Sequence, residues 1–175
     1  MSFDKALALT LDLEGGFVDD PADRGGATNQ GITQATYDRF RASIDALPQS
    51  VANITDDEVR RIYYDQYWIP GKCADLREPL DAVHFDSCVN VGVARAARLL
   101  QAAVRVAVDG IIGPRTLAAV AARDPAQLAQ ALCNERAQFY REIVEARPDQ
   151  SRFLKGWLNR VQTVRAGIGT DTVAV

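Results

Sequence analysis

Glu14 is the side chain in this sequence with the clearest setting for acid catalysis. It ends a segment in which Phe3, Leu7 and Thr10 share one face of a helix, and two glycines follow it. Apolar surroundings and the negative end of a helix dipole both disfavour a charged carboxylate, so such a carboxyl can hold a proton near neutral pH. A protonated carboxyl can donate to the leaving oxygen of a glycosidic bond. The alternative is a helix-end residue that simply faces solvent.

Glycoside hydrolysis also needs a group on the other side of the sugar, and the candidates lie in the loop after Glu14. The segment 17–31 (FVDDPADRGGATNQG) contains three aspartates, Asp19, Asp20 and Asp23, and Thr28 has a hydroxyl that can orient water. Aspartates before proline or glycine also stabilise turns, and threonine in a turn often bonds its own backbone. Spacing alone does not choose among these residues.

The segment 14–33 (EGGFVDDPADRGGATNQGIT) resembles the signature of glycoside hydrolase family 108, which comprises lysozyme-like N-acetylmuramidases found largely in phage endolysins and prophage regions. The resemblance continues at 63–68 (YYDQYW), 85–86 (FD) and 89–92 (VNVG). A further motif at 109–117 (DGIIGPRTL) is similar to one in several peptidoglycan-binding modules. The resemblance covers most of the chain and implies that Glu14 is the catalytic acid.

The wider lysozyme superfamily of phages often has an Asp nine residues after the Glu and a Thr a few residues later. Glu14, Asp23 and Thr28 are similar to that arrangement. The resemblance therefore implies that Asp23, helped by Thr28, is the second catalytic group, with Asp19 and Asp20 as competitors. It also implies a peptidoglycan hydrolase that cuts the β-1,4 bond between N-acetylmuramic acid and N-acetylglucosamine. Inversion and retention of stereochemistry both stay open, because the sequence does not give the separation of the carboxylates.

The substrate cleft is expected to combine aromatic rings with polar groups, because sugar rings stack on aromatic faces and sugar hydroxyls need polar partners. The candidates are Gln30, Tyr37, Tyr64, Trp68 and Asn90. Core packing is an equally good interpretation of Tyr37 and Trp68. Asn90 has an alternative role in capping or bridging helices.

The elements that must position these residues are mainly helices. Apolar spacing and capping signals predict helices at about 2–14, 33–44, 55–68, 79–90, 93–106, from 114, 125–146 and 150–165. The segment 17–31 predicts a structured loop or short β-hairpin. We expect a mainly α, lysozyme-like single domain over 1–175, with a catalytic part at about 1–92. The remainder, about 93–175, resembles a peptidoglycan-binding module in which the motif at 109–116 forms a turn and starts a helix.

Composition argues against several other classes of protein. A net charge of −3 and a pI near 5.2 predict no broad attachment to nucleic acid. His84 is the only histidine, and Cys73, Cys88 and Cys133 form no CxxC pair, so we expect no zinc hydrolase and predict no metal or organic cofactor. Each cysteine lies in an apolar, helix-like context and is expected to be a small buried residue. His84 and Cys88 are four positions apart, but the nucleophile and base of a peptidase usually come from different elements.

The N-terminal segment predicts no signal peptide, because Asp4 and Asp12 interrupt it and it has neither a basic start nor a small-residue cleavage site. No run approaches the roughly 18 apolar residues of a membrane span. We therefore expect synthesis in the bacterial cytoplasm, release by a separate holin-type partner, and action as a monomer on glycan strands in the periplasm or wall. A type VI effector or prophage-derived secretion factor would have a similar sequence. The main functional alternative is a non-catalytic peptidoglycan-binding or secretion-regulating protein on a muramidase scaffold. The intact Glu14, Asp23 and Thr28 argue against it.

Overall fold

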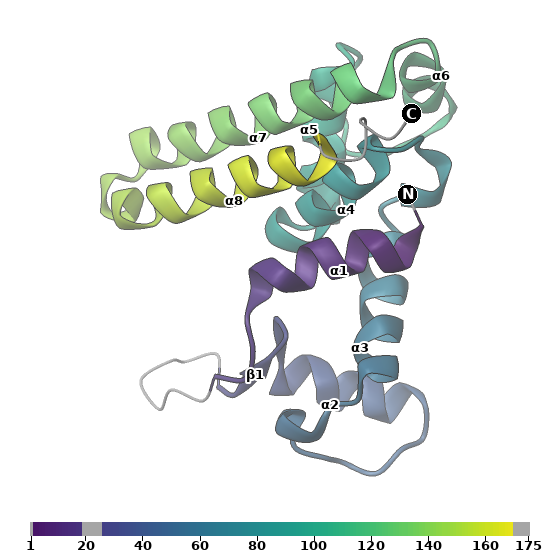
Figure 1. The fold of residues 1–175 in the computed structure, drawn as a ribbon, viewed down its shortest axis with the longest axis vertical. Helices are drawn as coiled ribbons and strands as arrows, with labels where there is room; N and C mark the ends of the chain where they lie inside the picture. Colours follow the sequence, from purple (N-terminus) through teal and green to yellow (C-terminus); the bar gives the residue numbers. More distant parts are fainter. Residues whose placement is uncertain (1, 19–25, 170–175) are drawn as a thin grey trace.

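The computed structural model describes residues 2–18 and 26–169, and it is mainly helical with one short antiparallel hairpin (Figure 1). This confirms the predicted fold class. The elements are α1 (Phe3–Glu14), β1 (Thr28–Asn29), β2 (Ile32–Thr33), α2 (Gln34–Ser43), η1 (Val51–Asn53), α3 (Asp56–Tyr63), η2 (Tyr64–Trp68), η3 (Cys73–Asp75), α4 (Leu80–Val91), α5 (Val93–Ala103), α6 (Pro114–Ala121), α7 (Pro125–Ala146), η4 (Pro148–Gln150) and α8 (Ser151–Gly169).

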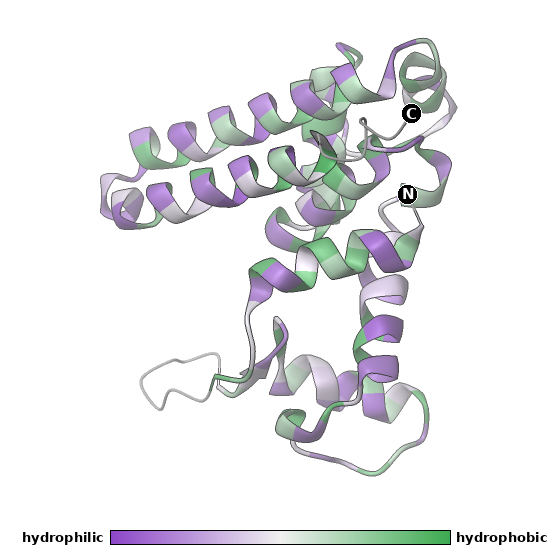
Figure 2. Cartoon of the chain, viewed as in Figure 1, coloured by the Kyte–Doolittle hydropathy of each residue, from purple (hydrophilic) through white to green (hydrophobic). Residues whose placement is uncertain are grey.

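Helix α4 is at the centre of the fold and packs against α1, α5, α7 and α8. All of its residues from 80 to 88 are buried, as expected of a helix enclosed on every side. In Figure 1, α1 lies between the hairpin, α2 and α3 on one side and the α4–α8 bundle on the other. Hydrophilic and hydrophobic residues alternate along α7 and α8, which is typical of helices with one buried face (Figure 2). Within the described residues, no helix combines the length and apolarity needed to cross a membrane.

The core consists of two apolar clusters that meet at α4. The first joins α1, β2, α2, α3 and part of α4, and the second joins α4, α5, α6, α7 and α8. Aromatic rings organise the first cluster: Phe3 meets Trp68 and Phe85 edge-on, with ring centroids 5.3 and 5.7 Å apart. Edge-to-face contacts of this kind stabilise beyond the area that they bury. The N-terminal half of α1 is thereby fixed against α4.

The capping signals predicted from the sequence are confirmed at two helices. The Ser2 hydroxyl accepts a hydrogen bond from the Lys5 N–H at the start of α1, and Gly15, at φ +79°, follows its last residue. Thr55 and Glu58 form a reciprocal capping box at the start of α3. The helix predicted at 55–68 is present, but its last turn, η2, is π-helical. The helix predicted at 93–106 ends earlier, because Arg105 adopts φ +56° just after α5.

Glu58 is tied into the fold by several hydrogen bonds. Its carboxylate accepts from the Thr55 N–H, from the Tyr37 hydroxyl at 2.8 Å and from the Arg41 guanidinium at 2.7 Å. Burial opposes ionisation of this group, but the hydrogen bonds outweigh it and lower the pKa of Glu58 to about 2. Glu58 therefore stabilises the folded state in its charged form.

We expect Glu58→Gln to change how stability depends on pH. Because the folded-state pKa lies below the ordinary value of 4.5, the contribution of Glu58 is complete above pH 4.5 and is lost as the pH falls toward 2. The variant should be less stable by about 1–2 kcal/mol at pH 7, a figure reduced for solvent screening, and the difference should narrow between pH 4.5 and 2. Urea unfolding across that pH range measures it. A difference that stays constant with pH would contradict the assignment.

Candidate active site

Glu14 is the last residue of α1 and lies on the helix face that carries Phe3, Leu7 and Thr10, all of which are buried. Its side chain is 19% exposed, so it does not extend into open solvent. The predicted helix end is therefore confirmed, and the carboxyl is half-buried at the point where α1 gives way to the glycine pair.

A tight hairpin turn lies directly beside the Glu14 carboxyl. Gln30 and Gly31 join β1 to β2, and both adopt positive φ, +48° and +75°, as a type I′ turn requires. A Cβ atom on Gly31 would lie 2.6 Å from the Tyr63 hydroxyl and 2.9 Å from Glu14 Oε2. The Tyr63 hydroxyl in turn donates to the Gln30 carbonyl at 2.8 Å. Glycine at position 31 thus allows the turn, the phenol and the carboxyl to meet.

Gly31→Ala is expected to disturb the site more than a matched glycine substitution does. Gly26 also has a positive φ, +71°, but a Cβ there would meet nothing within 4 Å. Both alanines carry the backbone strain of about 1–2 kcal/mol, and only Gly31→Ala adds crowding of about 1–3 kcal/mol against Tyr63 and Glu14. Denaturant unfolding of the two variants measures the difference. Equal stabilities would show that the hairpin relaxes away from Glu14 at no cost.

The surroundings of Glu14 differ from the apolar pocket expected from the sequence, because a charge network reaches it from α8. Arg160 Nη2 lies 2.7 Å from Glu14 Oε1 and 2.6 Å from Asp86 Oδ1, so one guanidinium serves both carboxylates. Asp86, on α4, is completely buried and also receives a hydrogen bond from Arg136 of α7. Asp86 thus faces two guanidinium groups, and Glu14 adds a second carboxylate to the network when it is ionised, which makes the burial of these charges tolerable.

The network continues from Arg136 to the surface. Arg136 Nε donates to the Tyr140 hydroxyl at 2.8 Å, and that hydroxyl donates to the side-chain carbonyl of Asn90. A connected path of ion pairs and hydrogen bonds therefore joins Glu14 to the exposed end of α4. Side chains held in such a path have little freedom to reorient.

Two tyrosines near Glu14 remain hydrogen-bond donors. Burial and, next in importance, the Glu14 carboxylate raise the pKa of both Tyr63 and Tyr67 above the ordinary value. Both phenols therefore keep their protons at physiological pH.

Of the predicted second catalytic groups, only Thr28 lies within the described residues. Its hydroxyl donates to the Gly26 carbonyl at 3.3 Å, and its backbone pairs with Val18 through two hydrogen bonds of 2.8 Å. Asp23 and its competitors Asp19 and Asp20 lie outside the described residues.

The residues predicted to bind substrate divide into two groups. Tyr37 and Trp68 belong to the core: Tyr37 is fully buried and donates to Glu58, and Trp68 is 5% exposed and packs on Phe3. Of the two interpretations of Tyr37 and Trp68, a cleft role and core packing, their burial supports core packing. Tyr64, which directly follows α3, is 37% exposed. Gln30 lies in the hairpin turn, where its backbone carbonyl accepts the hydrogen bond from the Tyr63 hydroxyl.

Asn90, the remaining predicted binding residue, lines a surface groove of about 380 Å³. The other residues lining this groove are Val91, Arg95, Phe139, Tyr140, Ile143 and Trp157. Asn90 follows Asp86 by four residues in α4, and Trp157 precedes Arg160 by three in α8. The groove therefore begins about one helical turn, roughly 5 Å, from the Asp86–Arg160 pair. Aromatic faces beside an amide and a guanidinium suit the recognition of sugars.

Arg160, Asp86 and Arg136 belong to the site but were not predicted from the sequence. One signal pointed to Arg160: it follows Trp157 by three positions and precedes Val164 by four, so a charge stands within the predicted apolar stripe of the last helix. A charge in such a stripe is rarely buried without a partner.

The three cysteines are buried, as predicted, and are free thiols. Cys88 Sγ lies 3.5 Å from His84 Nε2, but both residues are completely buried. No peptide can reach this pair, which argues against a Cys-His peptidase.

Comparison with known proteins shows the family of the chain. Residues 7–92 match the family model of glycosyl hydrolase 108, and residues 95–162 match that of a predicted peptidoglycan domain. The solved structure of SagA from Brucella abortus is 35% identical, with a TM-score of 0.79, and the match covers 98% of this chain and 96% of that chain. No curated protein matches this chain. The chain is thus a peptidoglycan-active protein that belongs to the glycosyl hydrolase 108 family.

Proposed function

We propose that the protein is an N-acetylmuramidase that hydrolyses the β-1,4 bond between N-acetylmuramic acid and N-acetylglucosamine, with Glu14 as the proton donor. The observation that carries the proposal is the position of one half-buried carboxyl where α1, the hairpin turn and α8 meet. The family match of residues 7–92 supports a glycoside hydrolase of peptidoglycan. No metal or organic cofactor is required by this chemistry.

Arg160 can stabilise the negative charge that the proposed reaction creates on Glu14. When Glu14 donates its proton to the leaving oxygen, the side chain becomes a carboxylate beside the guanidinium, at the 2.7 Å contact observed here. A preorganised partner for a charge that develops during the reaction lowers the barrier without reorganisation. Asp86 holds the Arg160 guanidinium in place. Its Oδ1 accepts hydrogen bonds from Arg160 Nη2 at 2.6 Å and from Arg160 Nε at 3.1 Å. Arg160 and Asp86 are thus positioning residues in this mechanism.

Asp23, helped by Thr28, is the proposed second group, which positions the attacking water or stabilises the positively charged sugar. The paired backbones of Val18 and Thr28 support it, because these two residues, which flank Asp23 in the sequence, lie together beside the hairpin that contacts Glu14. Asp19 and Asp20 belong to the same segment of the sequence and are the alternative sources of the carboxylate.

We propose the groove lined by Asn90 and Trp157 as the binding site for a sugar ring next to the cleaved bond. Its distance of about one helical turn from Arg160 is comparable with the length of one pyranose unit. Asn90 and Arg95 offer donors to the acetamido and hydroxyl groups of the sugar. The apolar lining comes from Trp157, which stacks on Tyr140 and Phe153, and from Phe139, over which Arg95 lies.

We also propose that the protein acts as a phage-type endolysin. In this scheme it is made in the bacterial cytoplasm and reaches the wall through a holin-type partner, where it works as a monomer. The resemblance of the 14–33 segment to phage muramidases supports this. A type VI effector or a prophage-derived secretion factor is the alternative setting for the same chemistry.

Digestion of isolated peptidoglycan tests the proposed reaction. The purified protein should release fragments with new reducing ends, and mass spectrometry after borohydride reduction should find reduced muramic acid at those ends. Reduced glucosamine at the ends would reassign the bond. A 1,6-anhydro end would show that the bond breaks without water. Binding to the wall without new ends would favour the non-catalytic wall-binding protein.

A further inference from the structure

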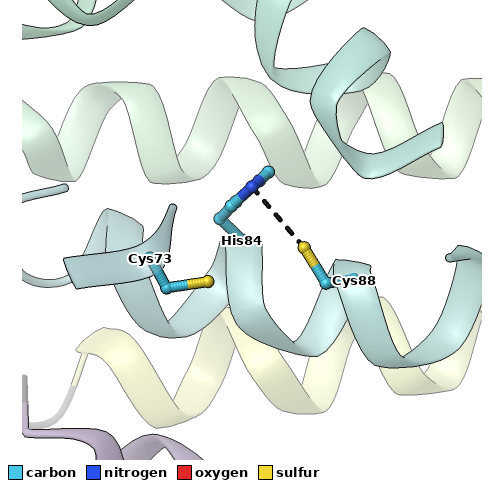
Figure 3. A group of neighbouring side chains, drawn as sticks. All are labelled: Cys73, His84 and Cys88. Atoms are coloured by element: carbon cyan, nitrogen blue, oxygen red, sulfur yellow. Dashed lines mark hydrogen bonds between the residues drawn. The ribbon is translucent and has the colours of Figure 1, made fainter. Parts of the chain in front are cut away.

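A compact group of sulfur and nitrogen ligands lies in the core. Cys73 begins η3, and His84 and Cys88 are one turn apart in α4. All three residues are completely buried, and one ligand atom from each lies within 4.8 Å of the other two. Figure 3 shows the three side chains converging from the two elements. The residues are thus arranged around a common point.

The distances in this group fit a small metal ion. With Zn–S near 2.3 Å and Zn–N near 2.0–2.1 Å, a tetrahedral site places sulfur and nitrogen about 3.6 Å apart. Cys88 Sγ and His84 Nε2 are separated by 3.5 Å. The Gly71 carbonyl oxygen accepts a hydrogen bond of 3.0 Å from the same nitrogen, and it becomes a fourth candidate ligand once an ion replaces that proton. A Cβ on Gly71 would lie 2.5 Å from the Tyr67 backbone carbonyl, 2.8 Å from Cys88 Sγ and 3.1 Å from Cys73 Sγ, so glycine at 71 lets the backbone approach both sulfurs.

The chemistry of the ligands selects the ion. Two thiolates and an imidazole are soft or borderline ligands, which favour zinc over magnesium or calcium. Two thiolates also neutralise a divalent ion, and a neutral complex suits a completely buried site. Within the described part of the chain, His84 Nε2 contacts both the Gly71 carbonyl and Cys88 Sγ, and only Nδ1 has no hydrogen-bond partner.

We propose that Cys73, His84 and Cys88, with the Gly71 carbonyl, form a structural zinc site that ties η3 to α4. Binding releases the two thiol protons to solvent, and the imidazole binds through Nε2 with its proton on Nδ1. The sequence predicted no metal because its three cysteines form no CxxC pair. The fold adds Cys73 to the His84–Cys88 pair, and zinc at this site does not depend on the proposed reaction at Glu14.

Zinc analysis of the protein refolded from denaturant tests the site, since buried ligands take up an ion most readily during folding. Refolding with Zn²⁺ under reducing conditions should leave one equivalent of zinc per chain after gel filtration, and Co²⁺ should give a thiolate charge-transfer band. Both signals should disappear in Cys88→Ser and Cys73→Ala. Both should persist in Cys133→Ser, because Cys133 is equally buried but lies in the second apolar cluster.

Thermal unfolding supplies the readout that does not depend on the variants folding well. The unfolding temperature of the wild-type protein refolded with Zn²⁺ should exceed that of protein refolded with a chelator by several degrees. Less than a tenth of an equivalent of zinc, with identical unfolding temperatures, would overturn the proposal. A Cys73–Cys88 disulfide in the protein as isolated, found by mass spectrometry after alkylation, would also overturn it in favour of a redox pair.

Discussion

Glu14→Gln is expected to stop the release of reducing ends from peptidoglycan while the protein still folds and binds the wall. Glutamine has nearly the same shape as glutamate but has no acidic proton to give, so the variant loses the general acid. General acid catalysis typically contributes about 10²–10⁴-fold to a rate, and we expect a loss in that range or beyond. The rate of appearance of reducing ends at saturating peptidoglycan measures it.

Asp12→Asn is the matched control for this substitution. Asp12 is an exposed carboxylate on the same helix, two residues before Glu14, and it lies off the buried face. Its variant should keep wild-type turnover. Glu14→Gln should change stability little, because Arg160 retains its contacts with Asp86. Turnover in Glu14→Gln within a few-fold of wild type would remove Glu14 as the acid, whereas loss of wall binding would point to a folding or binding defect.

The helices could be predicted from the sequence because their signals are local. The stripe of Phe3, Leu7 and Thr10 that ends in Glu14 repeats at helical spacing, and Gly15 follows at once. The capping box of Thr55 and Glu58 is likewise contained within four residues. Such patterns do not depend on the rest of the fold, which is why α1 and α3 begin where they were expected.

The electrostatic part of the site could not be predicted in the same way. Arg160 and Glu14 are 146 positions apart, and their contact depends on how α8 crosses α1 and α4. Periodicity says which face of a helix is buried, but not which remote charge meets it. The same holds for Cys73, which joins His84 and Cys88 only because η3 packs on α4. Tyr37 shows the same limit, since the sequence left a cleft role and core packing equally open and the fold places the residue in the core.

Asp86→Asn should be strongly destabilising, because Asp86 is the buried centre of the charge network. Arg136 is 1% exposed, and among the described residues Asp86 is the acidic partner of its guanidinium, so the variant leaves that charge without its counter-ion. Removing one partner of a buried ion pair typically costs about 3–5 kcal/mol, since the remaining charge stays desolvated. Urea unfolding at pH 7 should show a loss of that order. Glycan cleavage should fall as well, because Arg160 loses the contact that orients it toward Glu14.

Asp4→Asn separates the effect of burial from that of the ion pair itself. Asp4 and Arg60 also form an ion pair at 2.6 Å, but their side chains are 65% and 51% exposed. Exposed pairs contribute little, so this variant should unfold close to the wild-type midpoint. Adding Arg136→Met to Asp86→Asn should recover part of the lost stability, since it removes the stranded charge. If the double variant is as unstable as the sum of its parts, the cost of Asp86→Asn comes from lost packing in α4 and not from an unpaired cation.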